Sequence, residues 1–516
     1  MKICLIEPSK FVSLTNFVST ISMPPIGLAY IAAAARKANH RVSVVDGPGS
    51  APRSYFSFQG VTVRGLANAE IIKRIPKDVE AIGFGCMFSS NWVYVRELIK
   101  DVRKAFPKVF MVLGGEHGTG FPEFSMKQAP LDAVVMGEGE ETIIQLLDSV
   151  EKGLPLEQVP GIAFRDKAGA VRVNARRARI KNIDSIAWPA WDLFDIETYN
   201  RVNQPHGASQ GKFMPMLATR GCPFSCTFCT SPNMWTTQWI PRDPKNVVDE
   251  MQSYQKKYGT SDFQFEDLTA IVQRKWIGDF CDEIISREMR ITFQMPSGTR
   301  SESIDYEIAQ KLKAAGCHEF AFAPESGDPG VLKAIRKKVR LPSMFESARA
   351  AMKANINVGC FFIIGFPEDD YGSVLKTYAA IAKCAWLGFT NVNLNAYSPQ
   401  PNTESFRALV KNGVIADLND GYLLSLFTFQ DYGAKKTSYN PRFGHLELSF
   451  LVILGTAIFY GIFFLRKPYR IVQLFVDLAS DSARNKSNKM VKSMLKDAAT
   501  LLKNKILKPF KATGSG

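Results

Sequence analysis

The stretch TRGCPFSCTFC at residues 219–229 decides how the rest of this chain is interpreted. Its three cysteines, Cys222, Cys226 and Cys229, are spaced four and three residues apart, which places three thiolates in one loop. Thiolates are soft ligands that select iron–sulfur clusters, zinc or copper(I). Three thiolates can hold three irons of a [4Fe–4S] cube and leave the fourth iron open. Structural zinc requires a fourth protein ligand close by, and no Cys or His follows the motif before Cys281. The spacing predicts an iron–sulfur site, with a chance trio of buried cysteines as the alternative.

This motif resembles the Cys-x-x-x-Cys-x-aromatic-Cys signature of the radical S-adenosylmethionine (SAM) enzymes. The resemblance implies a [4Fe–4S] cluster whose open iron chelates the amino and carboxylate groups of SAM. It also implies an external electron donor, such as flavodoxin or ferredoxin, and cleavage of SAM to a 5′-deoxyadenosyl radical. Phe228 occupies the aromatic position, where its ring is expected to shield the cluster from water.

The whole chain has the size and composition of a multidomain globular protein. Its 516 residues predict two to four domains, and 46% of them are hydrophobic and 22% charged. Outside the motif the cysteines are scattered singly among apolar residues, which indicates a reducing compartment rather than a disulfide framework. The opening residues read as a strand without signal-peptide architecture, so we expect a cytoplasmic protein.

Residues 1–152 alternate strands with helices, which predicts a doubly wound α/β domain with a parallel sheet. The expected strands are 2–7, 41–46, 79–85, 109–113 and 133–136, and the expected helices are 26–39, 92–106 and 140–152. Ligands of such sheets bind beyond the carboxyl ends of the strands. Glycine-rich turns stand there at 114–119 and 137–140, where they let the backbone approach a bulky ligand.

The order of these parts resembles the cobalamin-binding domain that precedes the barrel in one subclass of radical SAM enzymes, with PPIGL at 24–28 and LGGEH at 113–117 as matching turns. The resemblance implies a cobalamin cofactor bound by Pro25, Gly27, Gly114, Gly115, Glu116, His117, Gly137 and Gly139. The chain lacks the Asp-x-His-x-x-Gly motif that ligates cobalt from below in other cobalamin proteins. His117 is therefore not an obvious lower ligand, and a structural role is its alternative.

Residues 153–212 read as a connector. They contain a hairpin pattern at 161–173 and the apolar bend AWPAWD at 187–192. We expect the tryptophan pair of this bend to pack the two domains together, with a lid over the substrate as the alternative.

From 213 to 406 the strand–loop–helix period repeats six times, which fits the partial (β/α)6 barrel of the radical SAM family. The expected strands are 214–218, 262–266, 291–294, 319–322, 358–364 and 391–396, and the expected helices are 244–258, 274–287, 305–315, 341–354 and 371–387. In such barrels the chemistry lies at the carboxyl ends of the strands.

The turns after these strands supply candidates for binding SAM. Glu266 and Asp267 follow the second strand, where the family places carboxylates against the SAM ammonium group, although a solvated carboxylate pair is the alternative. Glu325 and Ser326 lie in a turn that resembles the Glu-Ser-Gly turn of the family. Arg336 is a candidate for the SAM carboxylate, or belongs to a solvated basic face.

Two further features belong to the fifth barrel strand. Gly365 opens a Gly-Phe-Pro turn that the family places next to adenine. Cys360 lies within a continuous apolar run, so it is expected in the core, with hydrogen-atom donation at the barrel mouth as the alternative.

Residues 407–516 are expected to be helical and to contact a membrane. Residues 448–465 carry no charge, and a helix of this length would reach roughly 27 Å, just enough to span a bilayer. A span would put the basic tail, which holds +9 of the net charge of +15, on the outer side, against the positive-inside tendency. We therefore favour monotopic or re-entrant insertion on the cytoplasmic face, with a transmembrane anchor and a buried core helix as alternatives.

The tail itself, residues 488–508, has apolar residues at helical spacing opposite a lysine face, as a membrane-surface helix would. Nucleic acid is the less favoured partner, because few aromatic residues are interleaved with the basic ones.

Together these features predict a cobalamin-dependent radical SAM enzyme that methylates or cyclises an unactivated carbon of a small hydrophobic substrate, a lipid or a tetrapyrrole. The alternatives are a soluble natural product or tRNA as substrate, and a non-catalytic iron–sulfur or cobalamin-binding membrane protein. A tRNA methylthiotransferase usually has further N-terminal cysteines for a second cluster, and Cys4 and Cys86 are too few.

Overall fold

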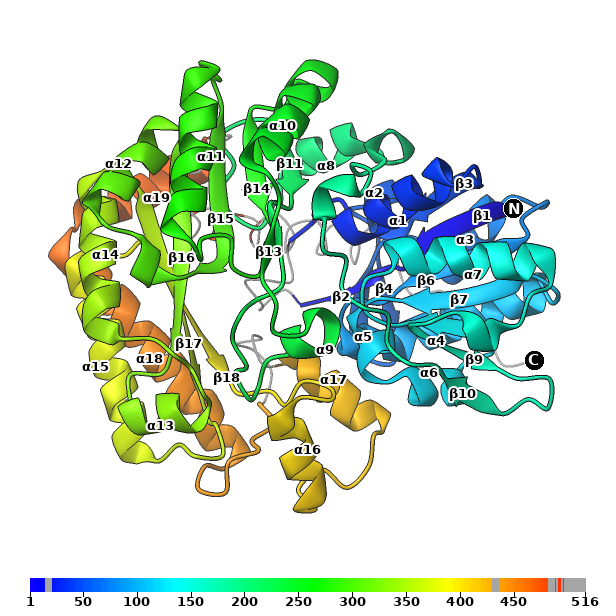
Figure 1. The fold of residues 1–516 in the computed structure, drawn as a ribbon. Helices are drawn as coiled ribbons and strands as arrows, with labels where there is room; N and C mark the ends of the chain where they lie inside the picture. The colour runs from blue at the N-terminus through cyan, green and yellow to red at the C-terminus, as the bar shows by residue number, and fades with distance from the viewer. Residues whose placement is uncertain (14–20, 429–435, 481–487, 489–490, 493–494, 496–516) are drawn as a thin grey trace.

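The computed structural model describes residues 1–13, 21–428 and 436–480, together with Asn488, Val491, Lys492 and Leu495. Two α/β units lie side by side, the N-terminal unit at the right and the barrel at the left of Figure 1. The chain thus has the mixed α/β architecture that the sequence predicts, with helices at its C-terminal end.

The N-terminal unit is built on a seven-stranded sheet in the order β10-β9-β8-β7-β6-β1-β3. Its parallel strands are β1 (Lys2–Glu7), β3 (Arg41–Asp46), β6 (Ala81–Gly85), β7 (Phe110–Gly114) and β8 (Ala133–Val135). Its helices are α1 (Ile26–Lys37), α2 (Gly47–Ser50), α3 (Asn68–Arg74), α4 (Trp92–Ala105), α5 (Glu116–Gly120), α6 (Pro122–Gln128) and α7 (Glu140–Lys152). The doubly wound prediction is confirmed.

Two features of this unit were not expected. The hairpin of β9 (Ile162–Arg165) and β10 (Val171–Val173) forms, but it extends the sheet antiparallel to β8. A small second sheet joins β2 (Lys10–Val12), β4 (Tyr55–Phe58) and β5 (Val61–Arg64).

The parallel strands define where a ligand would bind. From β1 the chain first adds β3 on one side and then β6, β7 and β8 on the other. The connections of β1 and β6 therefore leave in opposite directions, which opens a crevice beyond the carboxyl ends of these two strands.

The barrel unit is an open parallel sheet in the order β11-β14-β15-β16-β17-β18. Its strands are β11 (Phe213–Met216), β14 (Asp262–Phe265), β15 (Thr292–Thr299), β16 (Cys317–Glu325), β17 (Asn357–Ile364) and β18 (Asn391–Ala396). Its helices are α10 (Pro244–Tyr258), α11 (Arg274–Ser286), α12 (Tyr306–Ala314), α13 (Pro329–Ala334), α14 (Leu341–Lys353) and α15 (Tyr371–Leu387). The partial (β/α)6 barrel is confirmed.

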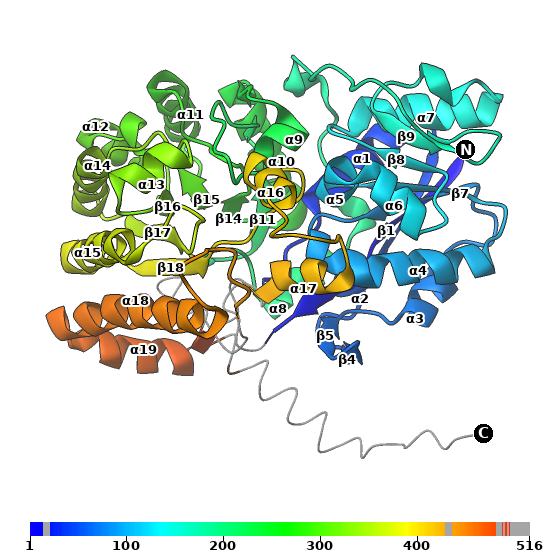
Figure 2. The same ribbon diagram turned by 90° about the horizontal axis from the view of Figure 1, so that it is seen from below.

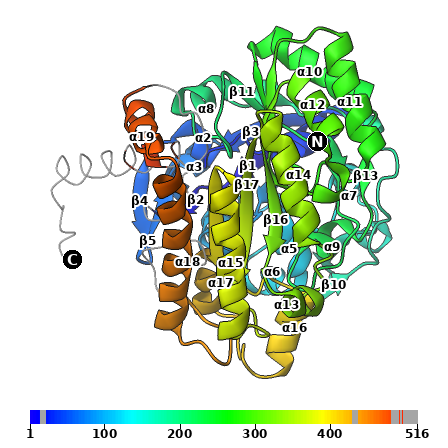
Figure 3. The ribbon, with the colours of Figure 1, turned by 90° about the vertical axis from the view of Figure 1, so that its left-hand side faces the viewer.

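The C-terminal helices continue this arrangement. They are α16 (Glu404–Lys411), α17 (Asp420–Thr428), α18 (His445–Arg466) and α19 (Tyr469–Ala479). Helix α17 reaches the N-terminal unit, where Asp420 pairs with Arg96 of α4 at 2.5 Å. Helix α18 lies along α15 and β18, in the position of a sixth barrel helix (Figures 2 and 3).

Within the described ranges, α18 is the one helix long and apolar enough to cross a membrane, by length and composition alone. The predicted tail helix at 488–508 lies largely outside the described residues.

The connector, including α8 (Ile196–Val202), joins the two units. Trp191 is buried, and the neighbouring Ala190 donates its backbone N–H to Ala29 O of α1 at 3.1 Å. Trp188 donates its indole N–H to Asn246 Oδ1 of α10 at 3.4 Å. The tryptophan bend therefore packs the units together, as predicted.

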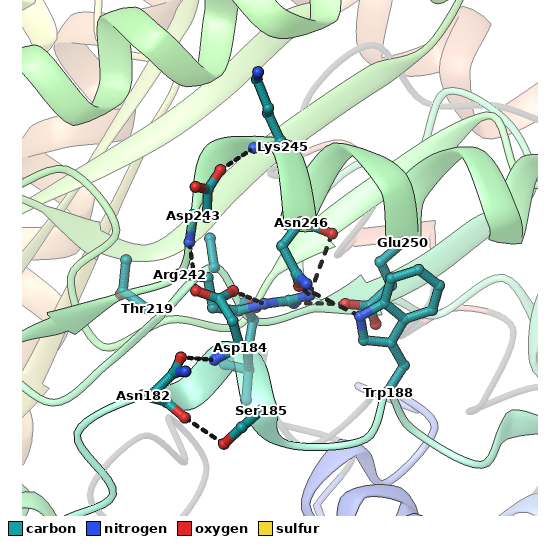
Figure 4. A network of polar contacts seen from close by, with 12 residues as sticks. Asn182, Asp184, Ser185, Trp188, Thr219, Arg242, Asp243, Lys245, Asn246 and Glu250 are labelled. Carbon is teal, nitrogen blue, oxygen red and sulfur yellow. Dashed lines mark hydrogen bonds and ion pairs between the residues drawn. The ribbon is translucent and has the colours of Figure 1, made fainter.

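Figure 4 shows how the connector is fixed to the barrel. The guanidinium of Arg242 lies 2.5 Å from Glu250 Oε2 and 3.7 Å from Asp184 Oδ1. Asp184 also accepts the backbone N–H of Asp243 at 2.9 Å. Because Arg242 and Glu250 are both buried, removing either would leave an uncompensated charge, so this network holds the connector rigidly.

Candidate active site

The cysteine loop lies between β12 (Thr219–Arg220) and α9 (Ser231–Trp235). Strand β12 pairs with β13 (Ile240–Pro241), so both ends of the loop are held. Gly221 has φ of +85°, and a Cβ there would lie 2.1 Å from Gln238 O. Only glycine fits this position, which fixes the direction in which the chain enters the loop.

The three thiols are partly buried at one end of the barrel. Burial raises the pKa of each, that of Cys229 to about 12, while the positive charges of Lys337 and Arg300 act in the opposite direction on Cys222 and Cys226. The backbone N–H of Ser231 donates to Cys229 Sγ at 3.4 Å. Nearby cations and N–H donors stabilise thiolate sulfur, as an iron–sulfur site requires.

The donor set fits a cluster. Among the described residues, no three His, Cys, Asp or Glu side chains gather closely enough to hold one metal ion, and these thiols are no exception. A [4Fe–4S] cube does not need such a gathering, because each cysteine binds a different iron.

Phe228 links the loop to the fifth barrel strand. Its ring packs against Phe366 with centroids 5.3 Å apart. The preceding Gly365 has φ of +88°, and a Cβ there would lie 2.8 Å from Leu448 of α18. Gly365 therefore fixes the turn against α18, and the partly buried Phe228 ring covers the loop from this side.

Glu325 and Lys337 form the ion pair closest to the thiols. Glu325 ends β16, is 7% exposed, and lies 2.8 Å from Lys337 Nζ. Burial lowers the pKa of Lys337, but the neighbouring Glu325 and Cys226 outweigh burial and hold it above its ordinary value. Glu325 was predicted, whereas Lys337 was missed, because Arg336 was favoured within the same basic run.

Arg336 does not face the site. Its φ of +54° turns the side chain away, and its guanidinium lies 2.7 and 2.9 Å from the carboxylate oxygens of Glu404 at the surface. Its carbonyl oxygen accepts from Cys226 Sγ at 3.8 Å. The predicted binding of the SAM carboxylate by the Arg336 side chain is therefore wrong.

The side chains of two other predicted SAM residues form hydrogen bonds within the protein itself. Asp267 is 2% exposed and accepts the backbone N–H of Thr219 at 2.5 Å and its hydroxyl at 2.6 Å, so it supports the strand before the cysteine loop. Burial raises the pKa of Asp267 to about 6. Ser326 is fully buried, and its hydroxyl lies 3.3 Å from that of Thr377 on α15. Neither side chain is free to contact a ligand, which corrects both predictions.

Cys360 is also excluded from the chemistry. It is fully buried on the outer face of β17, among the core side chains beneath α15, where Cys384 is its hydrogen-bonding neighbour. The alternative role as a hydrogen-atom donor at the barrel mouth is wrong, and Cys360 is a core residue as first expected.

Glu266 does face the barrel interior. Its Oε2 lies 3.1 Å from Nδ1 of His206, and its Oε1 is buried without a hydrogen bond. An unsatisfied buried carboxylate oxygen is costly, and a SAM ammonium group would satisfy it. No sequence pattern indicated His206, which lies in the connector beside the barrel, where Gly207 N donates to Gln264 Oε1 at 3.1 Å.

The predicted cobalamin turns lie at the carboxyl ends of the N-terminal sheet. A Cβ added at Gly27 or Gly114 would meet no atom within 4 Å, so the backbone is open there to a large ligand. Gly115 has φ of +107°, and a Cβ would lie 2.5 Å from Cys86 O. Met87, which is 62% exposed, adds an apolar surface beyond β6. These features fit a corrin ring.

The remaining cobalamin candidates have more local roles. Pro25 caps α1, and Gly139 precedes α7, where a Cβ would lie 2.7 Å from Ile31. Gly137 has φ of +75° and donates its N–H to Thr119 Oγ1 at 3.0 Å.

His117 belongs to the core. It is fully buried, stacks on Trp92 with centroids 4.6 Å apart, and contacts Ser89 Oγ at 2.9 Å. Burial lowers the pKa of His117 to about 3. His117 thus has the core environment that the structural alternative predicts, while its Nε2 is buried without a hydrogen bond.

The turn after β7 and the cysteine loop touch each other. Burial raises the pKa of Glu116 to about 7, a hydrogen bond with Thr230 acts against this shift, and Glu116 Oε1 remains without a partner. Thr230 follows Cys229 directly. Helices α5 and α9 pack together, with Thr119 Oγ1 3.9 Å from Met234 Sδ. The two predicted cofactor sites therefore lie next to each other.

A buried network of ion pairs supports the start of the cysteine loop. Arg220 lies 3.2 Å from Glu138 Oε1 and 2.5 Å from Glu140 Oε1, and Arg179 lies 2.6 Å from Glu138 Oε2. The Arg220 guanidinium also lies over the Tyr30 ring at 5.1 Å. The turn before α7 is thereby tied to a residue two positions before Cys222.

Comparison with known proteins decides the family. Residues 216–381 match the radical SAM superfamily, and residues 15–147 match the B12 binding domain. The chain therefore carries a B12-binding domain followed by a radical SAM domain, the domain order of the B12-binding radical SAM enzymes. Its cofactors are a [4Fe–4S] cluster, SAM and cobalamin.

Similar sequences include methyltransferases and cyclases. An uncharacterized methyltransferase of Pyrococcus horikoshii is 29% identical over 420 residues, 81% of this chain and 85% of the relative. The cytidylyl-2-hydroxyethylphosphonate methyltransferase of Streptomyces wedmorensis is 27% identical, covering 76% and 78%. The anaerobic magnesium-protoporphyrin IX monomethyl ester cyclase of Cereibacter sphaeroides is 28% identical, covering 75% and 60%.

The solved structure of the radical SAM methyltransferase TsrM from Kitasatospora setae, with cobalamin and a [4Fe–4S] cluster bound, has the same fold. The TM-score is 0.68 at 15% identity, and the alignment covers 97% of this radical SAM enzyme and 99% of TsrM.

Proposed function

We propose that this enzyme cleaves SAM reductively and modifies an unactivated carbon of a hydrophobic substrate, by methylation or by oxidative cyclisation. This proposal rests on the contact between the cobalamin turn at Glu116 and the cysteine loop at Thr230, because this contact brings the two predicted cofactor sites together. When bound, the cluster supplies the electron that breaks the C5′–S bond of SAM, and cobalamin supplies a methyl group.

The side chains around the thiols have distinct parts in this proposal. Glu266, with one oxygen lacking a hydrogen bond, accepts the SAM ammonium group. Lys337 faces the SAM carboxylate, because it is the buried cation beside Cys226. The ion pair with Glu325 holds the Lys337 side chain in place before SAM binds.

Exposed apolar side chains next to the predicted cobalamin turns favour an apolar substrate. Met87 and Phe88, each 62% exposed, lie beyond the carboxyl end of β6, where the sheet opens. The cyclase relative is named for a magnesium-protoporphyrin, a large apolar ring system. A lipid or tetrapyrrole therefore fits better than a small polar molecule.

A soluble natural product is the second candidate. The Streptomyces relative is named for a cytidylyl phosphonate, so a similar chain also serves a polar substrate. A cavity of about 760 Å³ beside the cysteine loop is lined by the cations Arg300, Lys333, Lys337, Lys338 and Arg340, which suit such a phosphate-bearing molecule.

The electron must come from outside the chain, and a small redox protein such as flavodoxin or ferredoxin is the proposed donor. The proposed location is the cytoplasm, on the inner membrane face.

The reaction is tested by anaerobic purification followed by incubation with SAM, a chemical reductant and a membrane-lipid extract. We expect 5′-deoxyadenosine, and a lipid product heavier by one methyl group for methylation or lighter by two hydrogens for cyclisation. Cys226→Ala loses a cluster ligand and should form no 5′-deoxyadenosine. Product formation only with polar metabolite fractions would favour the second candidate, and absence of 5′-deoxyadenosine from the wild type would contradict the proposal.

A further inference from the structure

Helix α18 presents two different apolar faces. The inner face packs on the barrel through buried side chains spaced three or four residues apart, namely Leu448, Val452, Gly455, Phe459 and Phe463. A Cβ at Gly455 would lie 2.4 Å from Leu394 of β18, and Tyr378 of α15 donates to Leu451 O at 2.5 Å. This close packing makes α18 part of the barrel wall, so it cannot leave to span a bilayer without uncovering β18.

The outer face of α18 and the following α19 remain exposed. Ten of the 23 exposed large hydrophobic side chains in the described residues fall between 446 and 476. They are Leu446, Phe450, Ile453, Leu454 and Leu465 on α18, and Tyr469, Ile471, Val472, Phe475 and Val476 on α19, with exposed fractions from 37% to 81%. A soluble monomer rarely exposes so many neighbouring apolar side chains, so this outer face marks a contact surface.

The charges at the junction of the two helices indicate what this surface contacts. Arg466 and Lys467 lie at the end of α18, and Arg466 lies over the ring of Trp386, itself 63% exposed, at 5.4 Å. Arg470, at the start of α19, lies over the ring of Phe463 at 3.8 Å. Of the two described acids on these helices, Asp477 is buried and Glu447 accepts the hydroxyl of Tyr371 at 2.5 Å. The rim of the surface is therefore cationic and carries an exposed tryptophan.

We infer that the outer faces of α18 and α19 form a docking surface for the interface of an anionic lipid bilayer, on which both helices lie in the membrane plane. Apolar side chains would enter the acyl boundary, while the cations of the junction meet phosphate headgroups. The exposed Trp386 beside Arg466 would supply a tryptophan of the kind enriched at membrane interfaces. This inference sharpens the proposed location and does not depend on the reaction.

The test uses the full-length holoenzyme and sedimentation with vesicles of phosphatidylcholine, with and without phosphatidylglycerol. The double variant Phe450→Ser/Phe475→Ser should lose about tenfold or more of its vesicle affinity, because two large exposed anchors are removed. Arg466→Gln/Lys467→Gln should lose the preference for phosphatidylglycerol and the salt sensitivity that accompanies it. The control, Leu154→Ser/Val414→Ser, alters two hydrophobic residues that are 50% and 53% exposed elsewhere on the surface, and it should bind as the wild type does.

Two results would overturn this inference. One is a wild-type holoenzyme that stays in solution with both kinds of vesicle. The other is a phenylalanine variant that binds vesicles normally but changes from dimer to monomer in analytical ultracentrifugation, which would assign the surface to a second copy of this chain. SAM cleavage with a chemical reductant, measured on the same variants, should be unchanged, so failed docking and failed chemistry are separable.

Discussion

The two sides of the cysteine loop use the same kinds of side chain for different purposes. On the side of the N-terminal unit, Arg220 lies between two buried glutamates, and each charge has a protein partner. On the side of the barrel mouth, Lys337 has one carboxylate partner beside a thiol, and Glu266 keeps an oxygen without a hydrogen bond. Glu140 Oε2 on the scaffold side also lacks a hydrogen bond, so neither burial nor one unsatisfied oxygen identifies a ligand-binding residue by itself. The two sides differ in that Glu140 has a buried guanidinium partner, whereas the Glu266 carboxylate has only His206 as a polar partner among the described residues.

The largest expected effect is on the scaffold side. Arg220→Ala would leave Glu138 and Glu140 buried without their cation, which should cost about 3–5 kcal/mol of unfolding free energy. Chemical denaturation of the apoprotein measures this loss. Arg172→Ala, which removes an exposed ion pair with Asp166, is the control and should cost less than about 1 kcal/mol. Equal losses for both variants would show that the buried ion pairs of Arg220 stabilise the fold no more than an exposed ion pair does.

The second prediction concerns pH and Asp267, which supports the loop from the barrel side. Its pKa of about 6 in the folded chain lies above the ordinary value of 3.8, so the folded state binds the proton more tightly. The stability that this group contributes is full below pH 4 and is lost as the pH rises through 6, by about 3 kcal/mol. Asp267→Asn should therefore show a flatter stability profile between pH 4 and 7 than the wild type. Parallel profiles would contradict this assignment.

The third prediction compares adjacent cations at the barrel mouth. Lys337→Met should reduce SAM cleavage by about tenfold or more, because one charge-assisted hydrogen bond is worth about 1.5–3 kcal/mol. Arg336→Met is the matched control, since its guanidinium pairs with Glu404 at the surface. The rate of 5′-deoxyadenosine formation with a chemical reductant measures both. Including Glu325→Gln in the Lys337→Met variant avoids an unpaired buried carboxylate. A larger loss for Arg336→Met would reverse the assignment.

The smallest expected effect separates Glu266 from its neighbour Asp267. Glu266→Gln should raise KM for SAM by about tenfold and leave the unfolding free energy within about 0.5 kcal/mol of the wild type. Asp267→Asn should do the opposite, losing about 1–3 kcal/mol of stability through its hydrogen bonds to Thr219. Unchanged KM in Glu266→Gln would show that this carboxylate does not bind SAM.

Most of the fold could be predicted from the sequence because its strands are buried apolar runs separated by regular helical segments. The cysteine spacing likewise fixed three ligands within one loop. The helix 244–258 was predicted with its observed bounds, since Asp243 caps its start and Gly259, with φ of +66°, ends it.

The orientation of individual side chains could not be predicted. The run 358–364 is apolar on both faces, so period-two alternation could not show that Cys360 points toward α15. Arg336 and Lys337 are chemically similar, and only the left-handed backbone at Arg336 decides which one faces the thiols. His206 comes from a connector whose path beside the barrel depends on contacts distant in sequence.

In the proposed site, three cysteines leave one iron of the cluster open to SAM. The electron paramagnetic resonance spectrum of the reduced holoenzyme, recorded before and after the addition of SAM, tests this arrangement. We expect a clear shift of the cluster g-values, because SAM becomes a ligand of the open iron. An unchanged spectrum, or a fourth protein ligand on the cluster, would contradict this arrangement.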